Sequence, residues 1–204
     1  MADPWHDVRQ AFADAADWFV ATAASVGDRW DEPGLGEWDV RALVGHTSRA
    51  LLTVETYLAA PAETAELDSA VGYFRATSAL AAGTAVAQRG RDAGAALGAD
   101  PAAAVAEIAA RVVPLIHGCD GSELLTTIAG GMRLADYLPT RTFELAVHTS
   151  DLATALGLPL DVPPTTAAQA LELIGELAVA QEVAGPLLRA CTGREGLPPR
   201  FSVL

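Results

Sequence analysis

The segment LADYLPTRTFELAVHTSDLATALG, residues 134–157, decides what this chain builds. On a helix, residues three, four and seven positions apart lie on one face, so Arg141, Glu144, His148 and Asp151 form a single polar stripe. Large apolar residues flank this stripe, while the far face carries mainly small residues, at Thr142, Ala146, Thr149 and Ala153. An ordinary amphipathic helix carries its charged residues on the face opposite its large apolar residues. We therefore expect the charges to point inward and to form one wall of a site.

The length and composition predict one helical domain. The chain has 204 residues, which suits a single domain over residues 1–204 with a real core. Hydrophobic residues make up 51% of the chain, and many of these are Ala, a strong helix former with little core volume. All 13 basic residues are Arg, which excludes Schiff-base lysine chemistry and a P-loop lysine. The expected fold class is all-α.

The charge argues against nucleic acid and membrane partners. The formal net charge is -13, no segment offers the basic patch that phosphate binding needs, and acidity disfavours anionic membranes. The N-terminal residues MADPWHDVRQ lack the features of a signal peptide, and no apolar stretch is long enough to span a membrane. Cys119 and Cys191 belong to no CxxC pattern, so neither a disulfide framework nor a catalytic cysteine is expected. The simplest localisation is cytoplasmic.

Caps, prolines and apolar spacing predict the helices, which we expect over residues 4–26, 40–60, 66–88, 101–117, 133–157 and 165–188. We expect Gly72 and Gly83 to interrupt the helical unit over 66–88. Asp39 and the pair Asp100-Pro101 are the clearest start signals. Between and after these helices we expect a loop over residues 89–101, a short extended element or loop over residues 122–132, and a strap anchored by Phe201, Val203 and Leu204. The pattern predicts an up-down helical bundle, in which residues 158–204 add a C-terminal helix and tail but no second domain.

The spacing Glu144-x-x-x-His148 puts a carboxylate and an imidazole one turn apart, which is how one helix offers two ligands to one metal ion. The plain alternative is a surface Glu-His pair. The apolar flanks favour a site, and His46, at the inner margin of the helix over residues 40–60, is a candidate third ligand. Two other interpretations stay open. In the first, His46 is only a packed or surface histidine and no metal ligand. In the second, Arg141 pairs with Glu144 and Asp151 in a buried ion-pair network that needs no metal.

Two motifs taken together resemble a known family. WDVRALVGH (residues 38–46) and RTFELAVHTSDLATALG (residues 141–157) resemble the mycothiol-dependent maleylpyruvate isomerase N-terminal-domain family, a branch of the DinB-like metal-binding four-helix bundles. The resemblance extends over nearly the whole chain. It implies a DinB-like four-helix bundle in which His46, Glu144 and His148 are the metal ligands, with Zn²⁺ or another divalent ion as the metal. It also implies a homodimer.

The resemblance implies thiol chemistry at this metal. Three protein ligands leave a coordination position open, which is typical of catalytic zinc, and a thiol bound there loses its proton to become a nucleophile. Mycothiol is then the expected cosubstrate, and the expected partners are a small-molecule thiol and an electrophilic substrate. Asp151 and Arg141 are the candidate catalytic residues. We expect Asp151 to hold an imidazole N–H of His148, and Arg141 to bind an anionic substrate group or to pair with a neighbouring carboxylate.

The same resemblance favours thiol transfer over isomerisation of maleylpyruvate. The family's isomerase carries a separate C-terminal domain that completes its active site, whereas residues 158–204 here are predicted to form one helix and a tail. The expected activity is that of a metal-dependent thiol transferase or isomerase of the mycothiol-dependent type. The alternative is a non-catalytic metal-binding bundle with a structural or stress-related role, in which the ion raises the melting temperature without any thiol chemistry.

Overall fold

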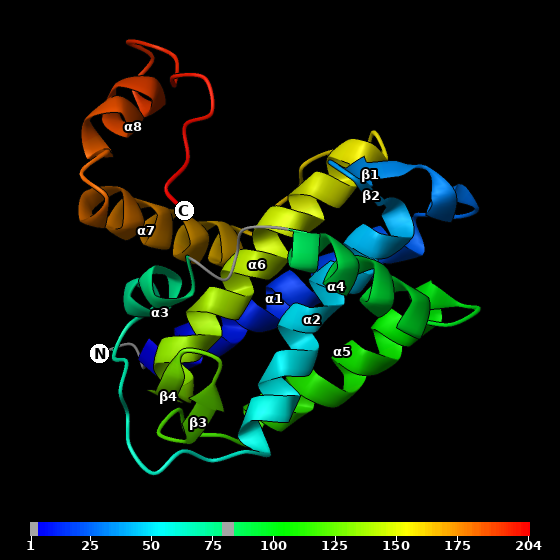
Figure 1. The fold of residues 1–204 in the computed structure, drawn as a ribbon, viewed down its shortest axis with the longest axis horizontal. Coiled ribbons are helices and arrows are strands. Elements are labelled where there is room, and N and C mark those ends of the chain that lie inside the picture. The colour runs from blue at the N-terminus through cyan, green and yellow to red at the C-terminus, as the bar shows by residue number, and fades with distance from the viewer. Residues whose placement is uncertain (1–3, 79–83) are drawn as a thin grey trace.

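Four helices surround one core in the computed structural model, which describes residues 4–78 and 84–204 (Figure 1). They are α1 (Pro4–Ala24), α2 (Val40–Leu58), α5 (Pro101–His117) and α6 (Leu134–Ala155). Helices α1 and α2 each pack against both α5 and α6, which closes the bundle. Each helix contributes fully buried apolar side chains to this core, among them Phe12, Phe19, Leu43, Leu51, Ile116, Leu138 and Leu145. The predicted all-α bundle is confirmed.

The remaining elements lie around this bundle. The other helices are α3 (Ala70–Thr77), α4 (Thr84–Ala96), α7 (Pro164–Ala180), α8 (Ala184–Cys191) and a 3₁₀ turn, η1 (Arg29–Asp31). Two small antiparallel pairs join β1 (Pro33–Leu35) with β2 (Trp38–Asp39) and β3 (Leu124–Thr127) with β4 (Gly130–Arg133). In the described part of the chain, no helix is long and apolar enough to cross a membrane.

Helix α6 is buried on nearly all sides, including the face of small residues. Thr142, Ala146, Thr149 and Ala153 are all buried, because the bundle core covers one side of α6 and helices α3 and α7 cover another. Phe143 and Ala146 pack there with Leu173 and Leu177 of α7 in a second apolar cluster. Small side chains on α6 allow α7 to approach closely. The side of α6 that stays partly exposed carries Glu144, His148 and Asp151.

The helix start signals behave as predicted. The Asp39 side chain accepts a hydrogen bond from the backbone N–H of Ala42 at 2.7 Å, and Asp100 accepts one from Ala103 at 3.1 Å with Pro101 in the first turn. Each carboxylate satisfies an N–H group that has no partner within its helix. Asp39 thereby fixes where α2 begins, and so the direction in which His46 points.

The prediction for residues 66–101 was partly wrong. The helical unit expected over 66–88 is α3 followed by α4, and the expected loop over 89–101 is helical as far as Ala96. Of the two expected interruptions, Gly72 lies inside α3, and Gly83 lies in residues 79–83, outside the described part. The glycines that indicated a loop instead allow close packing. A Cβ on Gly94 would lie 2.6 Å from the backbone oxygen of Arg41, and a Cβ on Gly90 would lie 2.5 Å from the Trp38 ring. Helix α4 therefore rests directly on α2 and β2.

Residues 122–132 contain the short extended element that was expected. Strands β3 and β4 pair in register from Leu124 opposite Arg133 to Thr127 opposite Gly130. The Thr127 hydroxyl donates to the backbone oxygen of Gly130 at 2.7 Å and closes the turn. The hairpin leads directly into α6, so it helps to fix the start of that helix.

The predicted helix over 165–188 is also divided in two. Helix α7 ends at Ala180, Glu182 has a φ of 60°, and α8 begins at Ala184. Pro186 lies in the first turn of α8, where a proline is tolerated because its missing N–H would have no partner within the helix. In the tail, Val203 packs against the second apolar cluster as expected, but Leu204 is 60% exposed and is not an anchor.

The contact between α2 and α4 can be tested by adding one methyl group. A Cβ on Gly45 would lie 2.1 Å from the backbone N of Gly94, so the two helices must separate. We expect Gly45→Ala to lower the free energy of unfolding by about 1–3 kcal/mol. Gly175→Ala on α7 is the matched control, since nothing lies within 4 Å of its Cβ and alanine favours a helix by about 0.5–1 kcal/mol. Urea unfolding of both variants checks this, and a Gly45→Ala protein as stable as Gly175→Ala would contradict the close contact.

Candidate metal centre

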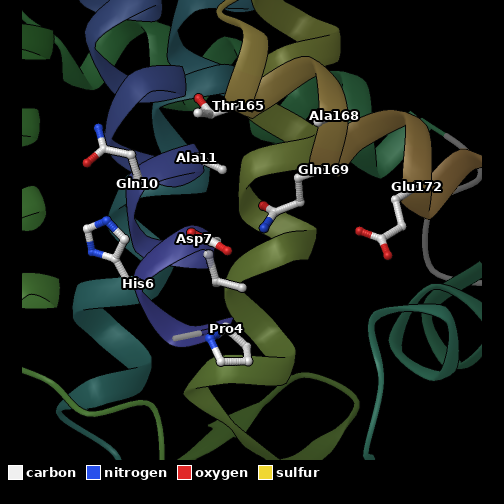
Figure 2. A pocket seen from close by; sticks show the side chains of 10 residues that line it. Pro4, His6, Asp7, Gln10, Ala11, Thr165, Ala168, Gln169 and Glu172 are labelled. Carbon is white, nitrogen blue, oxygen red and sulfur yellow. The ribbon is translucent and has the colours of Figure 1, made fainter. Parts of the chain in front are cut away.

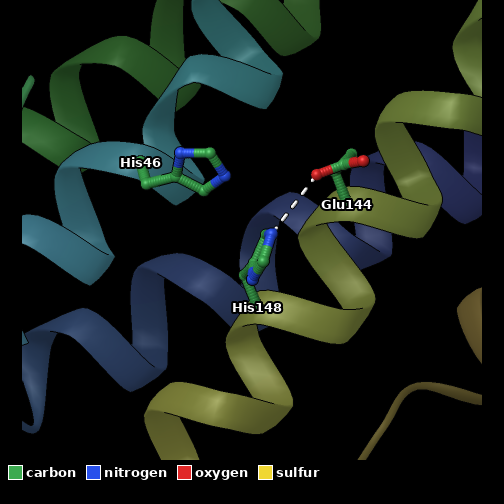
Figure 3. Close-up of side chains that lie close together, drawn as sticks. All are labelled: His46, Glu144 and His148. Carbon is green, nitrogen blue, oxygen red and sulfur yellow. Dashed lines mark ion pairs between the residues drawn. The ribbon is translucent and has the colours of Figure 1, made fainter. Parts of the chain in front are cut away.

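Helices α2 and α6 bring the three predicted ligands together (Figure 3). His46 comes from α2, while Glu144 and His148 lie one turn apart on α6, and one ligand atom from each lies within 4.8 Å of the others. The Nε2 atom of His148 is 3.3 Å from Oε2 of Glu144, and the two imidazole rings meet edge to face with centroids 4.8 Å apart. The side chains of His148 and Glu144 are 18% and 24% exposed, so the group lies at the edge of the core and not beneath it.

Asp151 contacts His148 on the side away from the other two residues. Its Oδ2 atom is 3.1 Å from Nδ1 of His148, one turn further along α6. A neutral imidazole with its proton on Nδ1 donates that proton to Asp151 and leaves the lone pair of Nε2 free. A carboxylate in this position is the usual way in which a protein orients a metal-binding histidine.

The charges in this group shift the pKa values strongly. Burial, together with the neighbouring His148, lowers the pKa of His46 to about 4. Burial alone would also lower the pKa of His148, but its hydrogen bonds to Asp151 and Glu144 raise it to about 9. Burial would raise the pKa of Glu144, but the hydrogen bond from His148 and the charge of Arg141 lower it to about 2. Without a metal, a proton on His148 therefore holds the two carboxylates together.

Arg141 lies deeper in the fold than the other charged residues of the stripe. Its guanidinium carbon is 5.3 Å from the ring centroid of Tyr73 and 4.9 Å from that of Tyr137, and only 9% of the residue is exposed. It makes no salt bridge with Glu144 or Asp151, whose partner is His148 in both cases. The alternative in which Arg141 pairs with Glu144 and Asp151 is therefore wrong, because both carboxylates pair with His148.

Trp38 lines the candidate site beside His46, which the sequence analysis did not predict. Its ring lies over His46 with centroids 4.5 Å apart and planes inclined by 33°. The indole N–H donates to the backbone oxygen of Ala87 at 2.9 Å, which ties the ring to α4. No local sequence signal indicates this contact, because Trp38 lies in β2 before α2 begins and its ring is held by a hydrogen bond to α4.

The three side chains fit a divalent metal ion by their chemistry. Two imidazoles and one carboxylate form a donor set that suits zinc, and such an ion would place its ligand atoms ~3.4 Å apart. His148 and Glu144 already have this separation. The Nδ1 atom of His46 is buried and has no hydrogen-bond partner in the described residues, so no polar contact at that atom opposes a rotation of the ring toward the other two ligands. His46, Glu144 and His148 would hold the ion.

Other chemistry-bearing residues lie away from this centre. A groove of about 650 Å³ between α1 and α7 has His6, Asp7, Gln169 and Glu172 among its lining residues (Figure 2), none of which belongs to the predicted site. Burial and the nearby Glu123 raise the pKa of Cys119 to about 11, which does not suit a nucleophile. Within residues 4–78 and 84–204, no second group of three His, Cys, Asp or Glu side chains is arranged to hold a metal.

Comparison with known proteins identifies one family. The model of the mycothiol maleylpyruvate isomerase N-terminal domain matches residues 8–153. No curated protein and no solved structure matches the chain. The matched range contains His46, Glu144, His148 and Asp151, and it ends just before the end of α6.

The two histidines can be told apart by titration of the metal-free protein. We expect the imidazole of His148 to keep its second proton up to a pH of about 9, while His46 stays neutral down to a pH of about 4. Proton-detected NMR of labelled histidines measures both values. Asp151→Asn removes a hydrogen bond that favours the charged form, so the pKa of His148 should fall in this variant. A wild-type His148 that loses its proton below its ordinary value of 6.5 would contradict the geometry.

Metal content tests the three-residue group directly. We expect the purified protein to bind about one zinc ion per chain and His148→Ala to lose it, because a site with two remaining ligands binds far more weakly. Zinc at 100 times its dissociation constant should stabilise the wild-type protein by about 2.7 kcal/mol. Elemental analysis and thermal unfolding give the two readings. The control is His6→Ala, which removes an exposed histidine of the α1 groove and should change neither.

Proposed function

This chain belongs to the mycothiol maleylpyruvate isomerase N-terminal domain family, and on that basis we propose that it is a metal-dependent thiol transferase or isomerase. In this proposal a divalent ion, zinc first, is held by His46, Glu144 and His148. The thiol is mycothiol or a close relative, and the second substrate is a small electrophile. The observation that carries the proposal is the convergence of these three side chains, from two helices, at the edge of the core.

The number of ligands supports a catalytic rather than a structural ion. Structural zinc is almost always held by four protein ligands, whereas three ligands leave one position for a substrate. An ion in this place lowers the pKa of a thiol and so supplies a thiolate near neutral pH. The partial exposure of Glu144 and His148 gives a small molecule access to that position.

The residues around the three ligands have separate tasks in the proposal. Asp151 accepts the Nδ1 proton of His148, which keeps Nε2 directed toward Glu144 and His46. Glu144 would supply an ionised carboxylate as the third ligand. Trp38 offers an apolar ring beside His46, against which an unsaturated or aromatic electrophile can pack. Asp151 thus orients a ligand, and the Trp38 ring excludes water from one side of the site.

The proposed reaction is addition or substitution by sulfur. With an unsaturated electrophile, a sulfur–carbon bond forms, the π electron pair moves to the next carbon, and that carbon takes a proton from water. With an electrophile that carries a leaving group, the same bond forms and the leaving group departs with its electron pair. For isomerisation, the adduct rotates about the former double bond before that carbon is protonated, and the electron pair then re-forms the π bond as the thiolate leaves. All three share one nucleophile and one site.

Further features of the proposal concern assembly and location. We propose a cytoplasmic homodimer, and the largely exposed side chains of Leu171, Val179 and Leu188 on α7 and α8 offer an apolar surface for a second copy. Sedimentation at micromolar concentration tests the dimer, and a single monomer species would contradict it.

Turnover at low pH tests the catalytic proposal. At pH 6.5 a free thiol of ordinary pKa is only ~1% thiolate, so the uncatalysed reaction is slow. We expect the zinc-loaded protein to accelerate the reaction of mycothiol with a chloronitrobenzene or an unsaturated acid by up to about 100-fold, and His148→Ala to lose this acceleration. Loss of free thiol, followed with a thiol reagent, is the measurement, and His6→Ala is the matched control. Stoichiometric zinc without turnover across a panel of electrophiles would instead support the non-catalytic metal-binding alternative.

A further inference from the structure

The two histidines of the candidate centre are held in different ways. His148 has a carboxylate at each ring nitrogen, because Nδ1 lies 3.1 Å from Asp151 and Nε2 lies 3.3 Å from Glu144. Figure 3 shows one ring nitrogen of His46 directed toward Glu144, but the Nδ1 atom of His46 is buried and has no hydrogen-bond partner in the described part of the chain. A metal-binding histidine almost always donates its second N–H to a neighbour, which fixes the plane of the ring. A different contact therefore has to fix the plane of His46.

The ring of Trp38 makes that contact. Its centroid lies 4.5 Å from the centroid of His46 and the two planes are inclined by 33°, which is the distance range of aromatic packing. Trp38 belongs to β2 and directly precedes Asp39, whose carboxylate caps the helix that carries His46. A large flat ring on its face restricts the imidazole to small changes of its plane. The contact uses the face of the imidazole and leaves its nitrogen atoms free.

Trp38 is itself fixed from the side of α4. Its indole N–H donates to the backbone oxygen of Ala87 at 2.9 Å. The same ring lies against Gly90, where an added Cβ would come within 2.5 Å of its Cε2 atom. The ring therefore has no space to move toward α4. Direct contacts thus lead from α4 through Trp38 to His46.

We propose that Trp38, held by α4, is a positioning residue of the metal centre, which fixes the plane of His46 as Asp151 fixes that of His148. This inference rests on the metal site of the proposed function and deepens it. Trp38 touches neither the ion nor its ligand atoms in this role. The competing role is a contact with the electrophile alone, which would change the KM for that substrate and leave zinc affinity unchanged.

Zinc affinity of two Trp38 variants tests the inference without any need for activity. Competition with a chelator gives the dissociation constant for zinc of the wild-type protein, Trp38→Leu and Trp38→Phe. We expect Trp38→Leu, which is apolar but has no ring, to bind zinc about 10- to 100-fold more weakly, as is typical when the partner of a ligand is removed. Trp38→Phe restores a ring beside His46 and should recover part of this affinity. Since both variants lack the indole N–H, the difference between them reports the ring contact, and equal losses would overturn the inference.

Gly90→Ala tests the same contact from α4, with Trp38 and all three ligands unchanged. The added methyl group forces the Trp38 ring to shift against His46, so we expect zinc to bind about 10-fold more weakly. Gly175→Ala is the matched control, because it makes the same change in helix α7 with nothing within 4 Å of the new Cβ. Melting of the metal-free proteins shows that each variant folds. If Trp38→Leu does not fold, Gly90→Ala against Gly175→Ala decides the question.

NMR of the metal-free protein keeps the failure of this inference apart from that of the proposed function. The Trp38 ring current should move the ring-proton resonances of His46 away from those of the exposed His6, and Trp38→Leu should abolish this shift. Wild-type His46 without such a shift overturns only this inference, as do wild-type and Trp38→Leu proteins of equal zinc affinity. Wild-type protein that binds no zinc overturns the proposed function itself, whatever the NMR result.

Discussion

The constraint on which this structure depends is that helix α6 carries four ionisable groups into a position where charge is unfavourable unless compensated. Their charges alternate along the helix when His148 is protonated, in the order Arg141 positive, Glu144 negative, His148 positive and Asp151 negative. Neighbours three and four positions apart therefore attract each other at every step. The four charges of this stripe sum to zero within about three turns, which makes their partial burial tolerable.

This arrangement determines how the other elements pack. A helix with small residues on one face and leucines on another is covered on both, by α7 and α3 on one side and by α1 and α2 on the other. Helix α2 contributes His46 at the point where the charged strip would otherwise be open. Its own outer side is then covered by α4, which approaches to backbone contact through Gly45 and Gly94. The site is therefore held by layers that extend well beyond its ligands.

Much of this could be predicted from the sequence, and the reasons differ from element to element. Two features depend only on neighbours in the sequence and could therefore be predicted: the helix caps at Asp39 and Asp100, and the spacing of charged residues on α6. The second part of helix α4, residues 89–96, was predicted as a loop because its glycines serve a contact with a distant helix, which local propensity does not reveal. The same limit applies to Trp38, whose position over His46 depends on the hydrogen bond to Ala87.

The alternating charges also bear on what the proposed centre would bind. In the metal-free protein the proton on His148 completes a neutral set with Arg141, Glu144 and Asp151. A divalent ion at the three ligands replaces that one proton, because His148 must be neutral to bind it. The same four groups with the ion then carry one surplus positive charge in a partly buried place. Arg49 and Arg89 add to it, since both lie close enough to His46 to lower its pKa. An anion at the open position would offset part of this positive charge, and a thiolate is such an anion. The charge pattern of α6 thus favours the nucleophile that the proposed chemistry requires.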